Sequence, residues 1–356
     1  MAEPIKKRLK HEQTPLIDGD VATFVWRGEK APDLVSDFTG WEEGKAVKLT
    51  EKKRGLWTYQ LHLPPDAYIE YNFVQGLENQ EDPYNPRQSP NGSGGYNHYF
   101  HMPDYLPTTL AEKRNKIPHG IVTRFVLPTE SMAFGSRRTV HLYHPPVERP
   151  VPLVVIWDGQ DYLHRVHLNL MVDNLIADQQ IQPLALAFVH NGGAAARSIE
   201  YACNDSTLIF LINKVFPLAR EHLNLIDIKT APGAYGVAGA SMGGLMALYT
   251  GARLPHVFGK VLSQSGAFCL GSMDTVVFNL LKKYERRPLK IWMDVGLYDL
   301  PSLLACNRRI QNTLVTAGYP LVYREYHAGH NYPAWRDEIW HGLVSLYGQA
   351  APAVTG

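Results

Sequence analysis

The amino-acid sequence predicts an α/β fold, in which a mostly parallel sheet carries helices on both faces and is preceded by a small all-β domain. Two patterns indicate this architecture. Strand-sized apolar runs alternate with helical stretches from about residue 117 onward, while residues 20–102 hold short runs rich in β-branched and aromatic residues. Continuous apolar strands separated by helices are typical of parallel sheets that are covered on both faces. The length of 356 residues agrees with about two domains.

The first domain is expected at residues 20–104, as a small β-sandwich. Its strands are predicted from β-branched and aromatic runs at 22–26, 56–63 and 68–74. Between residues 76 and 96 the composition shifts to Glu, Asn, Pro, Gly and Ser, which is typical of loops. An N-terminal tail at 1–19 and a linker at 105–117 complete this part of the chain.

The second domain is expected at residues 118–350, followed by a C-terminal tail at 351–356. Two strands near 120–127 and 138–143 indicate an antiparallel start. Further strands are predicted at 153–157, 184–189, 235–238, 261–264, 290–295 and 321–326. Helices are predicted near 167–178, 207–222, 243–253, 302–317 and 334–347. In such sheets, ligands bind beyond the carboxyl ends of the strands.

Composition and charge exclude several classes of protein. Hydrophobic residues make up 45% and charged residues 19% of the chain, which is too apolar for intrinsic disorder. Lys plus Arg number 35 against 34 for Asp plus Glu, and the net charge of +1 argues against a nucleic-acid or membrane-surface binder. No apolar run is long enough to span a bilayer, and the basic N-terminus lacks the apolar core of a signal peptide.

The cysteines indicate a cellular compartment. Cys203, Cys269 and Cys306 are widely spaced, odd in number and form no CxxC pair. This pattern favours free thiols in a reducing compartment over a disulfide framework. Together with the missing signal peptide, it predicts a cytoplasmic protein.

A candidate nucleophile lies between a predicted strand and a predicted helix. The segment GASMGG at 239–244 contains the pattern GxSxG with Ser241 at its centre. In this context the serine sits on a sharp turn above the sheet edge, and small flanking residues avoid collisions with the neighbouring strand and helix. The amide of Met242 would then face a developing oxyanion. The alternative is a glycine-rich turn that binds phosphate or only packs.

A serine hydroxyl needs a base, and the base needs an acid. His330 follows a glycine in the loop after the last strand and is the expected base, with His327 as a packed neighbour. The two histidines could instead be metal ligands, although no third ligand is evident nearby. Asp299, in the loop after strand 290–295, is the expected acid. Asp294 competes but lies within the strand, and Asp299 could instead be a turn or cap residue.

A second oxyanion donor is expected after the first parallel strand. The segment WDGQD at 157–161 contains a DG turn that would direct the backbone N–H of Gln160 toward the site. The alternative is an ordinary surface turn. His164 and His167, at the start of the next helix, are expected in surface or cap roles.

Several side chains are candidates for substrate binding. Arg197 could attract an anionic substrate, or Arg197 and Glu200 could only brace their loop. Aromatic residues near the expected site indicate a flat acyl group, although many of them could be packing. They are Trp157, Tyr162, Phe268, Tyr298 and Tyr332.

These motifs resemble the enterochelin esterase group of α/β-hydrolases, within the esterase D-like family, over residues 121–347. The matching pieces are DGQ at 158–160, GASMGG at 239–244, LSQSG at 262–266, GLYD at 296–299, GH at 329–330, WR at 335–336, RSIE at 197–200 and CN at 203–204. The resemblance implies Ser241 as nucleophile, His330 as base, Asp299 as acid, and the Gln160 and Met242 amides as the oxyanion hole. Two departures, Asp299 in place of Glu and Asn331 in place of Asp, put the triscatecholate substrate in doubt. Feruloyl and acetyl esterases share much of the pattern.

The N-terminal region resembles early-set immunoglobulin-like domains, which include glycogen-binding modules. The resemblance is carried by DFTGW at 37–41, GLW at 55–57, YNFV at 71–74 and DPYNP at 82–86. It allows Trp41 and Trp57 to be stacking platforms for a sugar or aromatic group, or core residues of the sandwich. Whether this domain contacts a glycan or caps the active site stays open at this point.

The sequence therefore predicts a serine esterase that acts on a small-molecule ester, without metal or other cofactor. A feruloyl- or acetyl-type carbohydrate esterase is the alternative enzyme. A glycan-binding protein with a non-catalytic hydrolase scaffold is the alternative of another class. No nucleic-acid or membrane partner is expected, and a homo-oligomer is left open.

Overall fold

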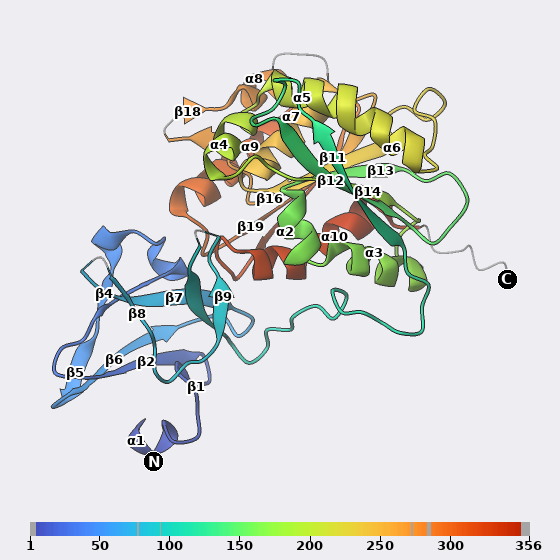
Figure 1. The fold of residues 1–356 in the computed structure, drawn as a ribbon. Helices are drawn as coiled ribbons and strands as arrows, with labels where there is room; N and C mark the ends of the chain where they lie inside the picture. The colour runs from blue at the N-terminus through green and yellow to red at the C-terminus, as the bar shows by residue number, and fades with distance from the viewer. Residues whose placement is uncertain (1–4, 77, 93, 272, 283–285, 350–356) are drawn as a thin grey trace. The chain divides into compact units, whose positions relative to one another are not determined.

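The computed structural model describes residues 5–76, 78–92, 94–271, 273–282 and 286–349 (Figure 1). The predicted C-terminal tail at 351–356 and the first four residues of the predicted N-terminal tail lie outside these ranges. The chain forms two compact units. The first comprises Met1–Pro107, Gly296–Pro301 and Glu325–Ala334, and the second comprises Thr108–Val295, Ser302–Arg324 and Trp335–Gly356.

The N-terminal part of the first unit consists of two antiparallel sheets, as the sequence predicts. One sheet has the order β1 (Leu16–Asp18), β2 (Val21–Arg27), β6 (Leu56–His62) and β5 (Thr50–Lys53). The other has the order β4 (Val47–Lys48), β3 (Asp33–Ser36), β7 (Tyr68–Gln75), β10 (Tyr96–His101) and β9 (Gln88–Pro90), with β8 (Glu78–Gln80) paired to β7. Short helical turns accompany them: α1 (Ile5–Arg8), η1 (Asp37–Thr39) and η2 (Glu43–Lys45).

An aromatic core holds these strands together. Phe24 of β2 meets Tyr71 of β7 edge to face, with ring centroids 5.0 Å apart, and Phe100 of β10 in the same way at 5.6 Å. All three rings are fully buried. Trp41 and Trp57 are partly exposed, and their indole N–H groups donate to Asp37 and to the carbonyl of Gly28, so both rings are fixed by their own unit.

The second unit is built on an eight-stranded mixed sheet. Its order is β11 (Ile121–Pro128), β12 (Arg137–His144), β14 (Ala185–Val189), β13 (Leu153–Trp157), β15 (Tyr235–Ala240), β16 (Phe258–Gln264), β19 (Lys290–Gly296) and β20 (Leu321–Tyr326). The first two strands pair antiparallel, as predicted, and β14 through β19 are parallel. Two short strands, β17 (Cys269–Leu270) and β18 (Met273–Asp274), pair separately.

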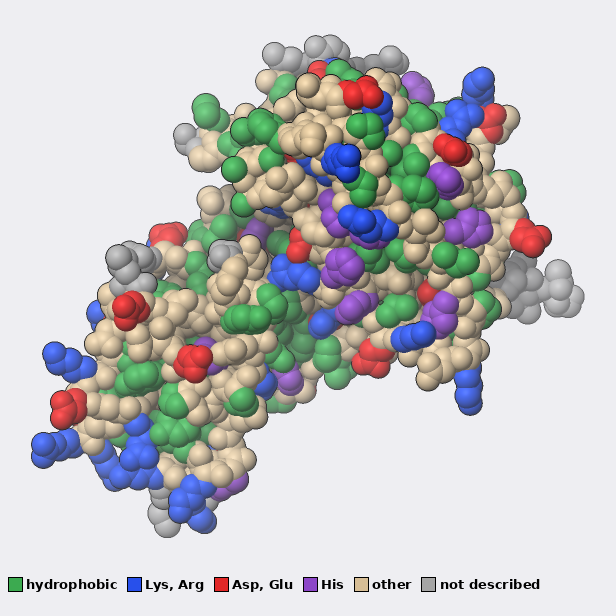
Figure 2. Space-filling model, viewed as in Figure 1, with side chains coloured by type: hydrophobic (Ala, Val, Ile, Leu, Met, Phe, Trp, Pro, Cys, Tyr) green, Lys and Arg blue, Asp and Glu red, His purple; other side chains and the backbone are tan. Residues whose placement is uncertain are grey.

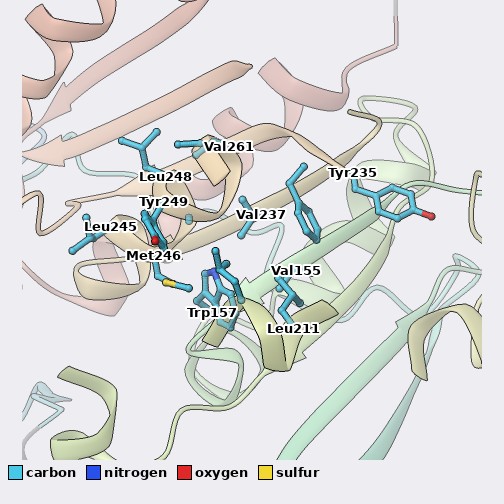
Figure 3. Close-up of a cluster of buried hydrophobic side chains, with 14 of the residues drawn as sticks. Val155, Trp157, Leu211, Tyr235, Val237, Leu245, Met246, Leu248, Tyr249 and Val261 are labelled. Atoms are coloured by element: carbon cyan, nitrogen blue, oxygen red, sulfur yellow. The ribbon is translucent and has the colours of Figure 1, made fainter. Parts of the chain in front are cut away.

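Helices cover this sheet on both sides (Figure 1). Figure 1 shows α5 (Asp205–Phe210) and α6 (Phe216–His222) on one side and α3 (Leu168–Ala177) and α10 (Tyr332–Tyr347) on the other. The central helix α7 (Met242–Arg253) is buried from Gly243 to Ala252, because it packs against β13, β15 and β16. Figure 3 shows part of the core that results, in which Trp157 lies near Met246 of the helix and Val155 lies near Leu211.

Some helices differ from the prediction. The expected helix 207–222 is α5 and α6 joined by a π-helical turn at Leu211–Val215. The DG turn at Asp158 leads directly into a helix, α2 (Gly159–His164), and two further helices appear at α4 (Ala194–Glu200) and α8 (Val276–Lys282). The helix predicted at 302–317 is α9 (Pro301–Thr316).

The prediction of three free thiols is wrong. Cys269 and Cys306 form a disulfide, with Cα atoms 6.1 Å apart, whereas Cys203 is a free cysteine. The two are 37 residues apart, and the fold brings β17 next to α9, a proximity that spacing along the chain does not reveal. The argument for a reducing compartment from free thiols is therefore lost.

Candidate active site

Ser241 lies on a sharp turn between β15 and α7. Its backbone angles, φ 58° and ψ −123°, are rarely adopted by residues with a side chain and therefore store strain. The turn is held by hydrogen bonds of 2.9 Å from the Ser241 amide to the Gln264 carbonyl and from the Ala267 amide to the Ser241 carbonyl. The side chain is partly exposed. This is the conformation that the GxSxG pattern predicts.

The glycines around Ser241 are required by close packing. A β-carbon at Gly239 would lie 2.5 Å from the carbonyl oxygen of Gly243, and one at Gly244 would lie 2.6 Å from Oγ of Ser263. Such separations are far below van der Waals contact, so any side chain there would force the turn apart. Met242 is the first residue of α7, and its amide has no acceptor within the helix.

Gln160 lies in the first turn of α2, after the left-handed residue Asp158 (φ 55°). Gly159 packs so closely on β14 that a β-carbon would overlap the backbone of Phe188. The Gln160 side chain accepts a 3.2 Å hydrogen bond from the Asn191 amide. As an early helix residue, Gln160 presents a backbone N–H that needs an acceptor outside the helix.

A buried ion pair fixes this segment. The Asp158 carboxylate, fully buried, accepts hydrogen bonds of 2.7 and 2.6 Å from the guanidinium of Arg197 and one of 2.7 Å from Asn191. Arg197 also donates, at 3.3 Å, to the carbonyl of Ala240, the residue before Ser241. The pair therefore links the loop of Gln160 to the turn of Ser241. The sequence pattern points to Arg197 but not to Asp158 as its partner, because no local signal pairs two residues that are 39 positions apart.

His330 and Asp299 are brought together in the first unit. Nδ1 of His330 lies 2.9 Å from Oδ1 of Asp299, and Oδ1 also accepts a 2.7 Å hydrogen bond from the Leu300 amide. Asp299 is buried, with 3% of its surface exposed, while the His330 side chain is 21% exposed. This geometry holds the ring nitrogen Nδ1 against a carboxylate, which favours the tautomer that carries its proton on Nδ1.

The competing residues are engaged elsewhere. His327 Nδ1 lies 2.7 Å from Oδ1 of Asp66, so the two histidines of the loop have separate carboxylate partners. Asp294 is fully buried in β19, where its Oδ2 accepts from Nε1 of Trp292 at 3.0 Å and from Gln264 at 3.2 Å. Over the described residues, no group of three or more His, Cys, Asp or Glu could hold a metal ion.

The proposed substrate-binding residues fall into two groups. Trp157, Tyr162 and Phe268 are at most 1% exposed and belong to the core, which supports the packing interpretation for them. Tyr298 and Tyr332 are partly exposed, and burial raises the pKa of Tyr298. These two retain the surface that contact with a substrate requires.

Glu200 has a structural partner, but it is not Arg197. Its buried carboxylate accepts hydrogen bonds of 2.5 and 2.8 Å from Arg138 and one of 2.9 Å from the Phe134 amide. The expected pair of Arg197 with Glu200 is therefore replaced by two separate ion pairs, Arg138–Glu200 and Arg197–Asp158. Because Glu200 is 2% exposed, it offers no surface to a ligand.

The remaining predicted positions agree with their surroundings. His164 ends α2 and His167 precedes α3 at its N-cap, and both are exposed, as expected for surface or cap roles. Asn331 Oδ1 accepts a hydrogen bond from the amide of Ala334 at 3.0 Å and caps the start of α10.

Among the described helices, none has the length and apolar character needed to cross a membrane.

A protein-family model matches most of the C-terminal part of the chain. Residues 131–346 match the model of the family Esterase, described as "Putative esterase". The chain belongs to this esterase family. The matched segment contains Ser241, Asp299 and His330 together with both predicted oxyanion residues.

Two relatives of the chain are iron(III) enterobactin esterases. The chain is 27% identical over 202 residues, 55% of its length, to the iron(III) enterobactin esterase of Escherichia coli (strain K12), and 25% identical over 282 residues to that of Dickeya dadantii (strain 3937). These alignments span 50% and 63% of the relatives' own lengths. Among solved structures, the enterobactin esterase FES from Shigella flexneri in the presence of enterobactin has a TM-score of 0.76 at 20% identity, covering 96% of this chain and 97% of that one. The two proteins therefore share a fold along nearly their whole length.

Proposed function

We propose that this esterase hydrolyses carboxylic esters through Ser241, His330 and Asp299. Ser241 Oγ attacks the ester carbonyl while His330 Nε2 takes its proton, and the negative charge of the tetrahedral intermediate falls on the carbonyl oxygen. The amides of Gln160 and Met242 stabilise that oxygen. His330 then returns the proton to the leaving alcohol, and water cleaves the acyl-enzyme by the same route.

The single observation that carries the proposal is the backbone of Ser241. A non-glycine residue at φ 58° and ψ −123° is costly, and such strain persists where it serves a function. One further feature supports it. Strands β15, β19 and β20 belong to one sheet, and the residues after their carboxyl ends are Ser241, Asp299 and His330. In α/β sheets this edge is where ligands bind.

The substrate class in this proposal is the ester of a catecholate siderophore. The sequence likeness to two iron(III) enterobactin esterases supports it, as does a likeness of fold that extends through the N-terminal strands. The partly exposed rings of Tyr298 and Tyr332 suit a flat aromatic acyl group. The N-terminal strands form, in this proposal, an early-set immunoglobulin-like domain, since two antiparallel sheets pack over a common core.

A substrate panel tests the proposal. We expect turnover of iron-free and ferric enterobactin with a higher kcat/KM than methyl ferulate, acetylated xylan or p-nitrophenyl acetate. The variant Ser241→Ala should lose all measurable turnover and all labelling by a fluorophosphonate probe, as read by intact mass spectrometry. The exposed nearby Ser198→Ala is the matched control and should retain both. Full activity of Ser241→Ala would refute the mechanism, and a preference for methyl ferulate would refute the substrate class.

A further inference from the structure

Asp37 is a buried acidic residue of the first unit that stands outside the proposed triad. It begins the turn η1 and is 3% exposed. Its Oδ1 accepts a 2.9 Å hydrogen bond from the indole Nε1 of Trp41, and its Oδ2 accepts a 2.7 Å hydrogen bond from the amide of Glu70. Donors from two different segments of the chain thus fix both oxygens of the side chain.

The carboxyl group of Asp37 lies directly against the loop that carries His330. A β-carbon added at Gly329 would overlap the carboxyl carbon and both oxygens of Asp37. Glycine is therefore required at 329 because of this close approach. The loop is held from its other sides too, because the Tyr68 amide donates to the His327 carbonyl at 2.9 Å and the Tyr298 amide donates to the Ala328 carbonyl at 3.1 Å.

Burial and the charges around Asp37 favour its neutral form. Burial raises its pKa well above the usual range, the charge of Glu70 adds to this, and Asp299 contributes further, while the hydrogen bonds from Glu70 and Trp41 act in the opposite direction. Tyr68 is a further titratable neighbour, and its own pKa is raised by burial and by Glu70. In the neutral form that burial favours, Asp37 adds no second negative charge near Asp299.

We propose that Asp37 is a positioning residue for the reaction, which seats Gly329 and thereby holds the His330 imidazole in line with Asp299. The inference rests on the proposed function, since His330 must be the base for its position to matter. Asp37 acts through Gly329 and touches no reacting atom. It gives the N-terminal β strands a direct part in shaping the histidine loop.

A second-site rescue tests the contact. Gly329→Ala places a methyl group on the Asp37 carboxyl and should lower kcat by about 100-fold, with KM changed little, because small displacements of a catalytic group are costly. Asp37→Ala should lower kcat by about tenfold, and Asp37→Asn, which keeps the shape of the side chain, should lose less. The double variant Asp37→Ala/Gly329→Ala should regain roughly tenfold over Gly329→Ala alone, because room for the methyl group is restored.

Two readouts separate positioning from simple stability. The matched control is Asp82→Ala, which removes another buried carboxylate of the first unit, bonded to Thr14 and Tyr71, and should lower stability while leaving kcat unchanged. The acidic limb of the pH profile of kcat/KM should stay in place in Asp37→Asn, because burial favours the neutral form of Asp37.

The outcomes distinguish this inference from the proposed function. If the wild-type chain neither turns over esters nor reacts with a fluorophosphonate, the proposed function fails. If it does both and Asp37→Ala keeps wild-type kcat, or the double variant is no better than Gly329→Ala, only the positioning role is overturned. A shift of the acidic limb in Asp37→Asn would also overturn the neutral form of Asp37.

Discussion

The imidazole of His330 is hydrogen bonded to Asp299, with Nδ1 and Oδ1 2.9 Å apart. The two residues are 31 positions apart and lie on loops that follow different strands, β20 and β19. Asp294 lies within β19, the strand that precedes the Asp299 loop, and its carboxylate is instead hydrogen bonded to Trp292 and Gln264. The carboxylate that orients the histidine is therefore the one in the loop.

Substitution of the acid should separate these two carboxylates. We expect Asp299→Asn to lower kcat by about 10⁴-fold, because an amide at this place favours the wrong imidazole tautomer. Asp294→Asn should lower the free energy of unfolding and leave kcat within a few-fold of the wild type. Steady-state kinetics on p-nitrophenyl butyrate, with urea unfolding in parallel, would measure both. The opposite ranking of the two variants would show that Asp294 is the acid.

Glu200 should matter for stability and not for substrate affinity. Removing its charge in Glu200→Gln leaves Arg138 buried without its counter-charge, which we expect to cost about 3 kcal/mol of unfolding free energy. KM of the folded variant should not change. The exposed pair Lys214–Glu130 provides the comparison, and Glu130→Gln should cost under about 1 kcal/mol. A higher KM with unchanged stability would restore Glu200 to substrate binding.

The disulfide should be visible in a thiol count. A thiol reagent applied to the unfolded, unreduced chain should titrate one group, Cys203, and three after reduction. Closing a 37-residue loop stabilises the fold by about 3–4 kcal/mol on chain-entropy grounds, so Cys306→Ser should lower the free energy of unfolding by up to that amount. Cys203→Ser should change it little. Three reactive thiols without reduction would contradict the pairing.

A cluster of histidines should make stability depend on pH. Figure 2 shows histidine side chains gathered on the viewed face of the second unit. His190 Nε2 lies 3.0 Å from Nδ1 of His141, and burial lowers the pKa of His190 to about 4, with His141, His164, Arg124 and Arg138 adding to the effect.

The sign follows from proton uptake. Between about pH 6.5 and pH 4 the unfolded chain carries a proton on His190 that the folded chain does not, so stability falls as the pH is lowered through this window. The loss should be about 1–2 kcal/mol, since the ring is partly exposed to water. The free energy of unfolding, measured with urea from pH 4.5 to 7, should fall less steeply with decreasing pH in His190→Gln than in the wild type. The pH dependence of the exposed variant His256→Gln should match that of the wild type. Identical slopes in all three proteins would rule out this effect.

Local patterns predicted much of the fold. The apolar runs 153–157 and 321–326 coincide with β13 and β20, and the antiparallel start was correct. The helix α2 was missed because the DG pair is typical of a turn, and Asp158 does adopt the left-handed conformation of a turn before the helix begins. The π-helical turn at Leu211–Val215 was also missed, since apolar periodicity over 207–222 fits one continuous helix equally well.

The site was predicted where its signal is local. Ser241 is recognisable from glycines two residues away on each side, and the structure shows the atoms that exclude larger residues there. The partners of Arg197, Glu200 and Cys269 were not predicted, because each lies 37 or more positions away and is chosen by the packing of the folded chain. Asp37 was missed for the same reason. Its surroundings give it a raised pKa, but its sequence neighbours are those of an ordinary turn.

The loops Gly296–Pro301 and Glu325–Ala334 belong to the same compact unit as the N-terminal strands. The second of these loops is held by a hydrogen bond from the Tyr68 amide, by the contact of His327 with Asp66 and by the packing of Asp37 against Gly329. A minimal enzyme trimmed to start after Pro107 would expose these loops to water and release the histidine from its supports. A design that transfers this site to another hydrolase should therefore include the N-terminal strands together with both loops.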